Sequence, residues 1–124
     1  MTTNEVQDYL DNIISILDSN GKLVVLFDRD KNKTFQYLYK ITTKEVEEVL
    51  RSLKVSDFEK KELSKNDSHK KRELYFFSPT RIYVAANGRE DTMKLYIKID
   101  LYSDKNLIVV ISFHEYGDFS EEVN

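Results

Sequence analysis

Residues 94–115 read KLYIKIDLYSDKNLIVVISFHE, and they consist of two apolar runs joined by a short polar connection. In the first run, residues 94–102, apolar and polar side chains alternate, which is typical of a strand with one buried face. The second run, residues 107–114, is apolar almost throughout and ends in Ser, Phe and His. Polar residues such as those of the connection favour turns. The stretch therefore predicts two antiparallel strands joined by a tight loop.

The register of these two strands can be predicted from their alternation, because a slip of one residue moves every side chain to the other face. A three-residue loop, residues 104–106, superposes the two all-apolar faces. These faces contain Leu95, Ile97, Ile99 and Leu101 in the first strand and Leu107, Val109, Ile111 and Phe113 in the second. Tyr96 then lies opposite His114, and Lys98 lies opposite Ser112. Directly opposed Cβ atoms are about 5 Å apart, so we expect these four polar side chains to form a cluster.

The preceding segments predict helices followed by strands. Residues 4–18 and the segment from Thr42 to Leu53 carry apolar side chains at helical spacing, and residues 34–40 resemble a short helix. Thr42 and Glu45 have the spacing of a capping box. Further strands are expected at residues 22–27, 73–77 and 81–86. The predicted class is α+β, with an antiparallel β-sheet packed with two to three N-terminal helices.

Composition describes a globular domain and excludes several kinds of site. The 124 residues are 40% apolar and 33% charged, which predicts one domain over residues 1–124 with a frayed acidic tail at 115–124. No cysteine is present, so disulfides and thiolate catalysis are excluded. No apolar run approaches the roughly 20 residues of a membrane span, and the first residues are acidic rather than basic. We expect a cytoplasmic protein that does not bind membranes and needs no metal or other cofactor.

Charge is distributed unevenly along the chain. The formal net charge of −3 argues against nucleic-acid binding, but residues 54–98 carry eleven lysines and arginines against seven acidic residues. Within this segment, residues 54–72 show neither a helical nor a strand period. We expect an irregular loop there, and long loops in compact domains are often functional.

Four segments occur in the order found in MqsR-family toxins of bacterial type II toxin–antitoxin systems. These segments are FDRDKN, ITTKEVEEVLRSLKVSDFEK, LYIKI and VVISFHE. The chain resembles this family over roughly residues 23–115. The resemblance implies a RelE-like fold and a metal-independent mRNA endoribonuclease, an mRNA interferase that inhibits translation and growth. It also implies a cognate antitoxin that neutralises the toxin by binding to it.

Carried over by position, the resemblance implies four catalytic residues. Lys60 follows SDF, Tyr96 and Lys98 form the YxK of a strand, and His114 follows SF. Metal-independent RNA cleavage needs a base for the 2′-hydroxyl proton, a cation for the charged phosphorane and an acid for the leaving oxygen. Imidazole titrates near neutral pH, and ammonium groups stabilise developing negative charge. The structural alternative is a histidine at the surface end of a strand, beside a tyrosine that fills a cross-strand pair.

Other basic and aromatic side chains are candidates for contacts with RNA. The basic residues that we expect to contact phosphates are Lys61, Lys65, Lys70, Lys71, Arg72 and Arg81. A run of charges is also the usual composition of a solvated surface. The aromatic residues Tyr75, Phe76, Phe77 and Tyr83 can stack on bases, although most of them are expected in the core.

A second function from a different class remains open. The chain outside residues 54–98 is strongly acidic. This favours a non-catalytic inhibitory binding protein on the same scaffold, either a phage-type inhibitor or an inactive toxin relative, that uses its acidic surface against a basic protein partner.

Overall fold

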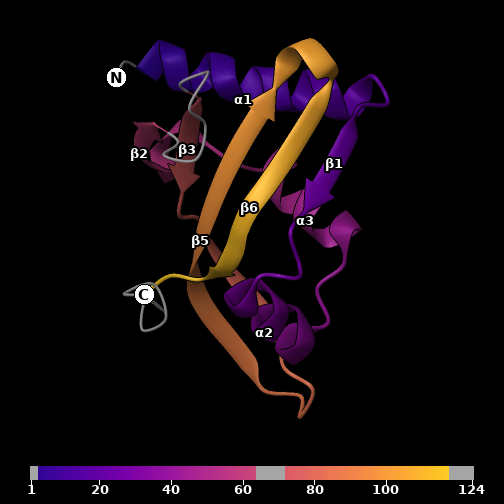
Figure 1. Ribbon diagram of the computed structural model, residues 1–124. Helices are drawn as coiled ribbons and strands as arrows, with labels where there is room; N and C mark the ends of the chain where they lie inside the picture. The colour runs from indigo at the N-terminus through magenta and orange to yellow at the C-terminus, as the bar shows by residue number, and fades with distance from the viewer. Residues whose placement is uncertain (1–2, 64–71, 118–124) are drawn as a thin grey trace.

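The computed structural model describes residues 3–63 and 72–117. Within these residues the helices are α1 (Thr3–Asp18), α2 (Asp30–Tyr39) and α3 (Thr43–Arg51), with short 3₁₀ turns η1 (Val55–Asp57) and η2 (Ser103–Lys105). The strands are β1 (Lys22–Val25), β2 (Phe58–Leu63), β3 (Glu73–Phe77), β4 (Thr80–Val84), β5 (Glu90–Tyr102) and β6 (Leu107–Glu115). The chain has the predicted α+β class (Figure 1).

The sheet is organised around β5, its longest strand. The strand order is β1-β6-β5-β3-β2, and β4 pairs with the first half of β5 while β3 pairs with the second half. Pro79 lies between β3 and β4, where its carbonyl oxygen accepts from the N–H of Leu95 at 2.8 Å. The pairs are antiparallel as predicted, except that β1 runs parallel to β6. The described sheet is therefore mixed.

The three described helices pack against one face of the sheet. In Figure 1, β5 and β6 lie in front of α1, so the view is of the other face. The core joins Leu10 and Ile13 of α1 and Val46 of α3 to Leu95 and Ile97 of β5. Burying each such side chain contributes about 1.5–3 kcal/mol. No helix within the described ranges is long and apolar enough to cross a membrane.

Local signals at the helix ends act as the sequence predicts. The Thr42 hydroxyl accepts from the N–H of Glu45 at 3.2 Å, and the Glu45 carboxylate accepts from the N–H of Thr42 at 3.1 Å. This confirms the capping box. At the end of α1, Asn20 adopts a left-handed conformation with φ of 62°, and the N–H of Gly21 donates to the carbonyl of Ile16 at 2.8 Å.

The predicted irregular loop is wrong for its first part, because residues 58–63 form β2 along the edge of the sheet. Five of these six side chains are exposed, so the strand lacks the apolar alternation that sequence reasoning relies on. Its pairing with β3 places Lys60 opposite Phe76. Lys65, Lys70 and Lys71 lie outside the described residues, as do residues 118–124 of the expected tail.

Candidate functional site

The predicted cross-strand pairs are present. Tyr96 lies opposite His114 and Lys98 lies opposite Ser112 in the ladder between β5 and β6. The loop differs from the prediction, because Tyr102 pairs with Leu107 and four residues connect them. Asn106 adopts a left-handed conformation, with φ of 52°.

A β-bulge reconciles the longer loop with the predicted pairs. Lys98 pairs with Ser112 but Ile99 pairs with Val110, so β6 carries one extra residue, Ile111. Before the bulge the core-facing residues of β6 are even-numbered, and after it they are odd-numbered. The fully buried residues of β6 are Ile108, Val110 and Phe113, so the prediction that Leu107, Val109 and Ile111 face the core is wrong. The bulge reverses the facing of the first half of β6, whereas Ser112 and His114 keep the predicted face, away from the helices.

Asn32 of α2 holds the bulge in place. Its side-chain amide donates to the carbonyl oxygens of Ile111 at 2.8 Å and Leu26 at 2.9 Å, and its side-chain oxygen accepts from the N–H of Phe113 at 2.8 Å. The side chain is buried, and these bonds satisfy backbone groups of β6 that lie beyond its last pair with β1, Val25 with Val110. Sequence reasoning gave Asn32 no structural role, because it lies among charged residues that show no apolar period.

Three of the four predicted catalytic residues lie around one phenylalanine, and the fourth, His114, lies beside Tyr96. We call Phe76, Lys60, Tyr96, Lys98 and His114 the Phe76 cluster. The Nζ atoms of Lys60 and Lys98 lie 4.7 Å and 5.5 Å from the centroid of the Phe76 ring, which are cation–π distances. The Tyr96 ring centroid is 5.8 Å from that of Phe76 and 5.2 Å from that of His114. Four strands thus bring together residues that are up to 54 positions apart in the chain.

Burial separates the members of the Phe76 cluster into two levels. Phe76 and His114 are each only 2% exposed, whereas Tyr96 and Lys98 are half-buried and Lys60 is exposed. Nδ1 of His114 is 3.0 Å from the carbonyl oxygen of Glu115. A carbonyl can only accept, so Nδ1 carries the proton and Nε2 is the nitrogen that can accept one. The two lysines and the tyrosine therefore form the outer surface, with the imidazole beneath them.

Two further features border the Phe76 cluster. Tyr116 extends the row of rings, with its centroid 5.9 Å from that of Tyr96, and Nζ of Lys94 lies 4.3 Å from the centroid of Tyr116. Glu59 accepts from the Ser78 hydroxyl at 2.6 Å and pairs with Lys94 at 3.2 Å. The Ser78 bond is the main cause of the lowered pKa of Glu59. Sequence reasoning missed Tyr116, which lies just beyond the apolar pattern of β6.

The residues predicted to contact phosphates do not all join the Phe76 cluster. Arg72 lies on the same face but pairs with Asp100 at 2.9 Å and stacks at 3.5 Å on the ring of Tyr102. The bond to Asp100 raises the pKa of Arg72. This arrangement belongs to the opposite end of β5, because Tyr102 is its last residue.

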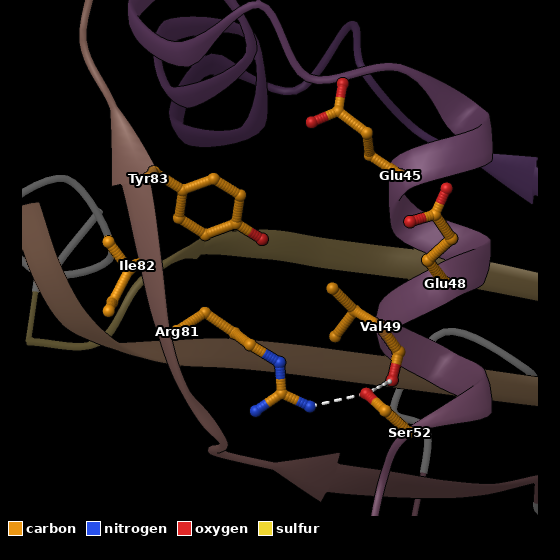
Figure 2. Close-up of a pocket in the computed structure, with 7 residues that line it drawn as sticks. All are labelled: Glu45, Glu48, Val49, Ser52, Arg81, Ile82 and Tyr83. Carbon is orange, nitrogen blue, oxygen red and sulfur yellow. Dashed lines mark hydrogen bonds between the residues drawn. The ribbon is translucent and has the colours of Figure 1, made fainter. Parts of the chain in front are cut away.

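Lys61 and Arg81 face the other side of the sheet. Lys61 pairs with Glu73 at 2.7 Å, and this bond raises the pKa of Lys61. Arg81 points from β4 toward α3, where its guanidinium donates to the Ser52 hydroxyl (Figure 2). Neither side chain is in place to contact a ligand of the Phe76 cluster. Among the residues that the structure describes, no group of three or more His, Asp or Glu is arranged to hold a metal ion.

Comparisons with protein-family models, with curated proteins and with solved structures gave no match. The resemblance to MqsR-family toxins therefore stays a prediction from the sequence.

Proposed function

We propose that the protein is a metal-independent endoribonuclease of the toxin type, which cleaves mRNA in the cytoplasm and is neutralised by a cognate antitoxin. The observation that carries this proposal is that Lys60, Lys98 and Tyr96 gather around Phe76, with His114 next to Tyr96. Four residues selected by family resemblance lie within one cluster, although three strands contribute them. Lys60 pairs with Phe76, Phe76 with Lys98 and Tyr96 with His114, so the sheet register places all four residues on one face.

The chemistry follows from what each group can do. The 2′-oxygen of the RNA attacks the adjacent phosphorus, its proton passes to a base, and the bond to the 5′-oxygen breaks as that oxygen takes up a proton. The products are a 2′,3′-cyclic phosphate and a 5′-hydroxyl. Lys60 and Lys98 would stabilise the charge of the phosphorane, because both ammonium groups lie over the same ring. Tyr96 lies beside them and would contact the reacting oxygens.

The burial of His114 gives it a different place from the lysines. An imidazole that is 2% exposed does not meet RNA directly, so within this proposal His114 is a positioning residue that acts through Tyr96. Their ring centroids are 5.2 Å apart. His114 would thereby hold the phenol ring in place beside the lysines.

Lys60 and Lys61 provide a matched pair of variants for testing the proposal. They are adjacent in β2, but Lys60 lies over Phe76 whereas Lys61 pairs with Glu73 on the other face. Purified wild-type protein and the variants Lys60→Gln, Lys61→Gln, Lys98→Gln and Tyr96→Phe are incubated with end-labelled RNA, with and without ribosomes. We expect wild type and Lys61→Gln to cleave and the other three to lose about 10²-fold or more of the rate.

The role of His114 needs a readout that a general loss of stability would not give. His114→Asn is expected to lower kcat with little change in KM, because a positioning residue acts on the reacting groups and not on substrate binding. Growth of bacteria after induced expression gives the matching readout in cells. A wild-type chain that leaves RNA intact and growth unchanged would overturn the proposal. Equal losses in Lys60→Gln and Lys61→Gln would overturn the assigned site.

One observation favours the second candidate, a non-catalytic binding protein. Asp8, Asp11 and Asp18 are exposed on α1, so the helix layer presents negative charge. A basic protein would be attracted to this surface. An inert wild type that binds such a partner through α1 is the result expected of this alternative.

A further inference from the structure

A groove lies between α3 and the edge of the sheet, away from the Phe76 cluster. We call it the α3–β4 groove. It has a volume of about 300 Å³ and is lined by Glu45, Glu48, Val49, Ser52, Arg81, Ile82 and Tyr83. Figure 2 shows Arg81 and Tyr83 pointing from β4 toward α3, with the two glutamates on the helix. Its wall on one side is a helix, and its wall on the other is a β-strand.

β4 has an unpaired edge along this groove. Among the described strands it pairs with β5 alone. The bonds from Leu95 N–H to Pro79 and from Ala85 N–H to Arg89 set the phase of that ladder. Because such bonds alternate, the N–H and C=O groups of Ile82 and its neighbours two residues away point away from β5. Natural edge strands usually carry charge or proline at such positions.

The side chains along this edge are those of a surface that receives a partner. Ile82 is 63% exposed and Val84 is 55% exposed, although both belong to a regular strand. On the groove side, the Tyr83 hydroxyl is buried and has no hydrogen-bond partner. A buried tyrosine hydroxyl normally has one. This oxygen can accept a hydrogen bond from a ligand when a side chain of the groove moves aside to admit it.

Charge in the α3–β4 groove selects the kind of ligand. Glu45 and Glu48 contribute two carboxylates from one side of α3. The opposing cation, Arg81, already donates to the Ser52 hydroxyl and to the carbonyl of Thr80. The groove can therefore bind a further group that donates hydrogen bonds and carries positive charge. A lysine or arginine side chain supplies both.

We propose that β4 binds an extended, basic segment of a partner protein by strand addition, with one lysine or arginine side chain in the α3–β4 groove. The backbone of the segment pairs with the free edge at Ile82. Because side chains alternate along a strand, every second residue of the segment faces α3 and the others lie beside Ile82 and Val84. The basic side chain contacts Glu48 and donates to the Tyr83 hydroxyl.

Two other occupants fit the observations less well. A second copy that paired through its own β4 would bring two α3 helices, each with several glutamates, onto the same side of one sheet, where their charges repel. RNA would meet carboxylates rather than cations, and its backbone does not match a strand edge. The inference uses no member of the Phe76 cluster, so it stands independently of the ribonuclease proposal.

The probe is a capped, fluorescently labelled peptide of sequence TKVKVKT, tested against full-length protein by fluorescence anisotropy. A peptide of sequence TEVEVET is the control for charge, and TKVKVKT with alternate N-methylated amides is the control for strand pairing. We expect TKVKVKT to bind about tenfold more tightly than either control. The amides of Ile82 and Val84 are expected to gain protection from hydrogen exchange, because the peptide satisfies them.

Matched variants locate the site. Glu48→Gln is expected to weaken TKVKVKT binding about threefold, whereas Glu47→Gln leaves it unchanged, because Glu47 pairs with Arg51 outside the groove. Ile82→Pro removes an N–H that points away from β5, so it keeps the β4–β5 ladder and is expected to abolish binding. Tyr83→Phe is expected to weaken binding without loss of folding.

Three results would overturn the inference. The first is a lack of TKVKVKT binding at a peptide concentration of about 1 mM, the weak limit of specific association. The second is binding that Glu48→Gln, Tyr83→Phe and N-methylation all leave unchanged. The third is a dimer of the protein, seen by sedimentation without peptide, that Ile82→Pro abolishes. That result would assign the edge to a second copy.

Discussion

Phe76 and Phe77 are neighbours in β3 and are almost equally buried, with exposures of 2% and 1%, yet they face opposite sides of the sheet. The Phe77 ring packs against those of Tyr9 and Phe58, beneath the helices. The Phe76 ring is covered by Tyr96 and by the ammonium groups of two lysines. Two adjacent residues of one type thus occupy two kinds of environment.

The comparison shows how each face excludes water. On the helix-covered face, apolar residues cover one another, and the hydrophobic effect is sufficient to explain the packing. On the open face, lysine side chains lie over a ring while their charged ends stay near water. Beneath this layer His114 and Ser112 are buried, and polar groups lower stability unless they are hydrogen-bonded. Such an arrangement is typical of a surface that positions polar groups for a ligand.

The largest expected effect comes from truncating the two rings. Phe77→Ala is expected to lower the free energy of unfolding by about 4 kcal/mol, because the rigid core around it leaves a cavity. Phe76→Ala is expected to cost about 3 kcal/mol, since lysine side chains can move into the space. Urea denaturation measures both. RNA cleavage should separate them further, because Phe76→Leu is expected to lower it and Phe77→Leu is not. Equal effects of the two leucine variants on cleavage would remove the distinction between the faces.

Asn32 holds the bulge that decides which residues of β6 face each side of the sheet. Its replacement by alanine is expected to have the next largest effect on stability. Asn32→Ala leaves the N–H of Phe113 and the carbonyl of Ile111 without their bonds, which is expected to lower the free energy of unfolding by about 3 kcal/mol. The bulge would then lose its anchor, so the nuclear Overhauser contact between the Tyr96 and His114 rings should weaken. Asn4→Ala, at an exposed position of α1, is the control. A variant that keeps full stability and the ring contact would show that the ladder alone fixes the bulge.

The pairing of Tyr96 with His114 was more predictable from sequence than the facing of the residues in β6. Alternation in residues 94–102 correctly placed Tyr96 opposite His114, because the two ends of the strands carry unambiguous polar residues. It failed near the loop, where Ile108, Val110 and Ile111 are equally apolar and periodicity cannot tell which of them face the core. The bulge depends on a side chain 79 positions away, at Asn32, and single-strand patterns contain no information about such a contact.

The edge strand β2 shows a second limit of sequence reasoning. An irregular loop was predicted because residues 58–63 lack an apolar face. The strand exists because β3 supplies its pairing partner, and a backbone ladder needs no particular side chains. The resemblance selected Lys60 without knowing its element. The structure adds the reason that Lys60 and Lys61 differ, which is that they point to opposite faces.

Gly21 connects α1 to β1 at a point where the backbone is closely packed. A Cβ at this position would lie 2.6 Å from the carbonyl oxygen of Ile16 and 2.8 Å from that of Asn106. Backbone atoms cannot easily move aside, so Gly21→Ala is expected to lower the free energy of unfolding by about 2 kcal/mol. Gly88→Ala is the matched variant, because a Cβ there meets open space and only its positive φ of 85° opposes the change. We expect about 1 kcal/mol for it by thermal or urea unfolding. A larger loss for Gly88→Ala than for Gly21→Ala would contradict this close contact.

The smallest expected effect concerns Tyr83, whose hydroxyl lies in the α3–β4 groove. Burial raises the pKa of Tyr83 to about 12. The folded state therefore favours the neutral phenol more than the unfolded state does, so the stabilisation is complete below pH 10 and is lost as the pH rises from 10 to 12. Tyr83→Phe removes this loss, and the variant should fall less steeply than wild type in alkaline urea unfolding.

The same substitution gives opposite results for stability and for binding. At pH 7, removing a buried hydroxyl without a hydrogen-bond partner is expected to raise the free energy of unfolding by about 0.5–1 kcal/mol. Binding of a basic segment should weaken, because the acceptor is gone. If Tyr83 were retained only for packing, Tyr83→Phe would raise stability and would not weaken binding. If Tyr83→Phe instead lowers stability at pH 7, the hydroxyl already has a hydrogen-bond partner in the free protein. The edge of the helix-covered face would then leave no buried polar group without a hydrogen bond for a ligand to use.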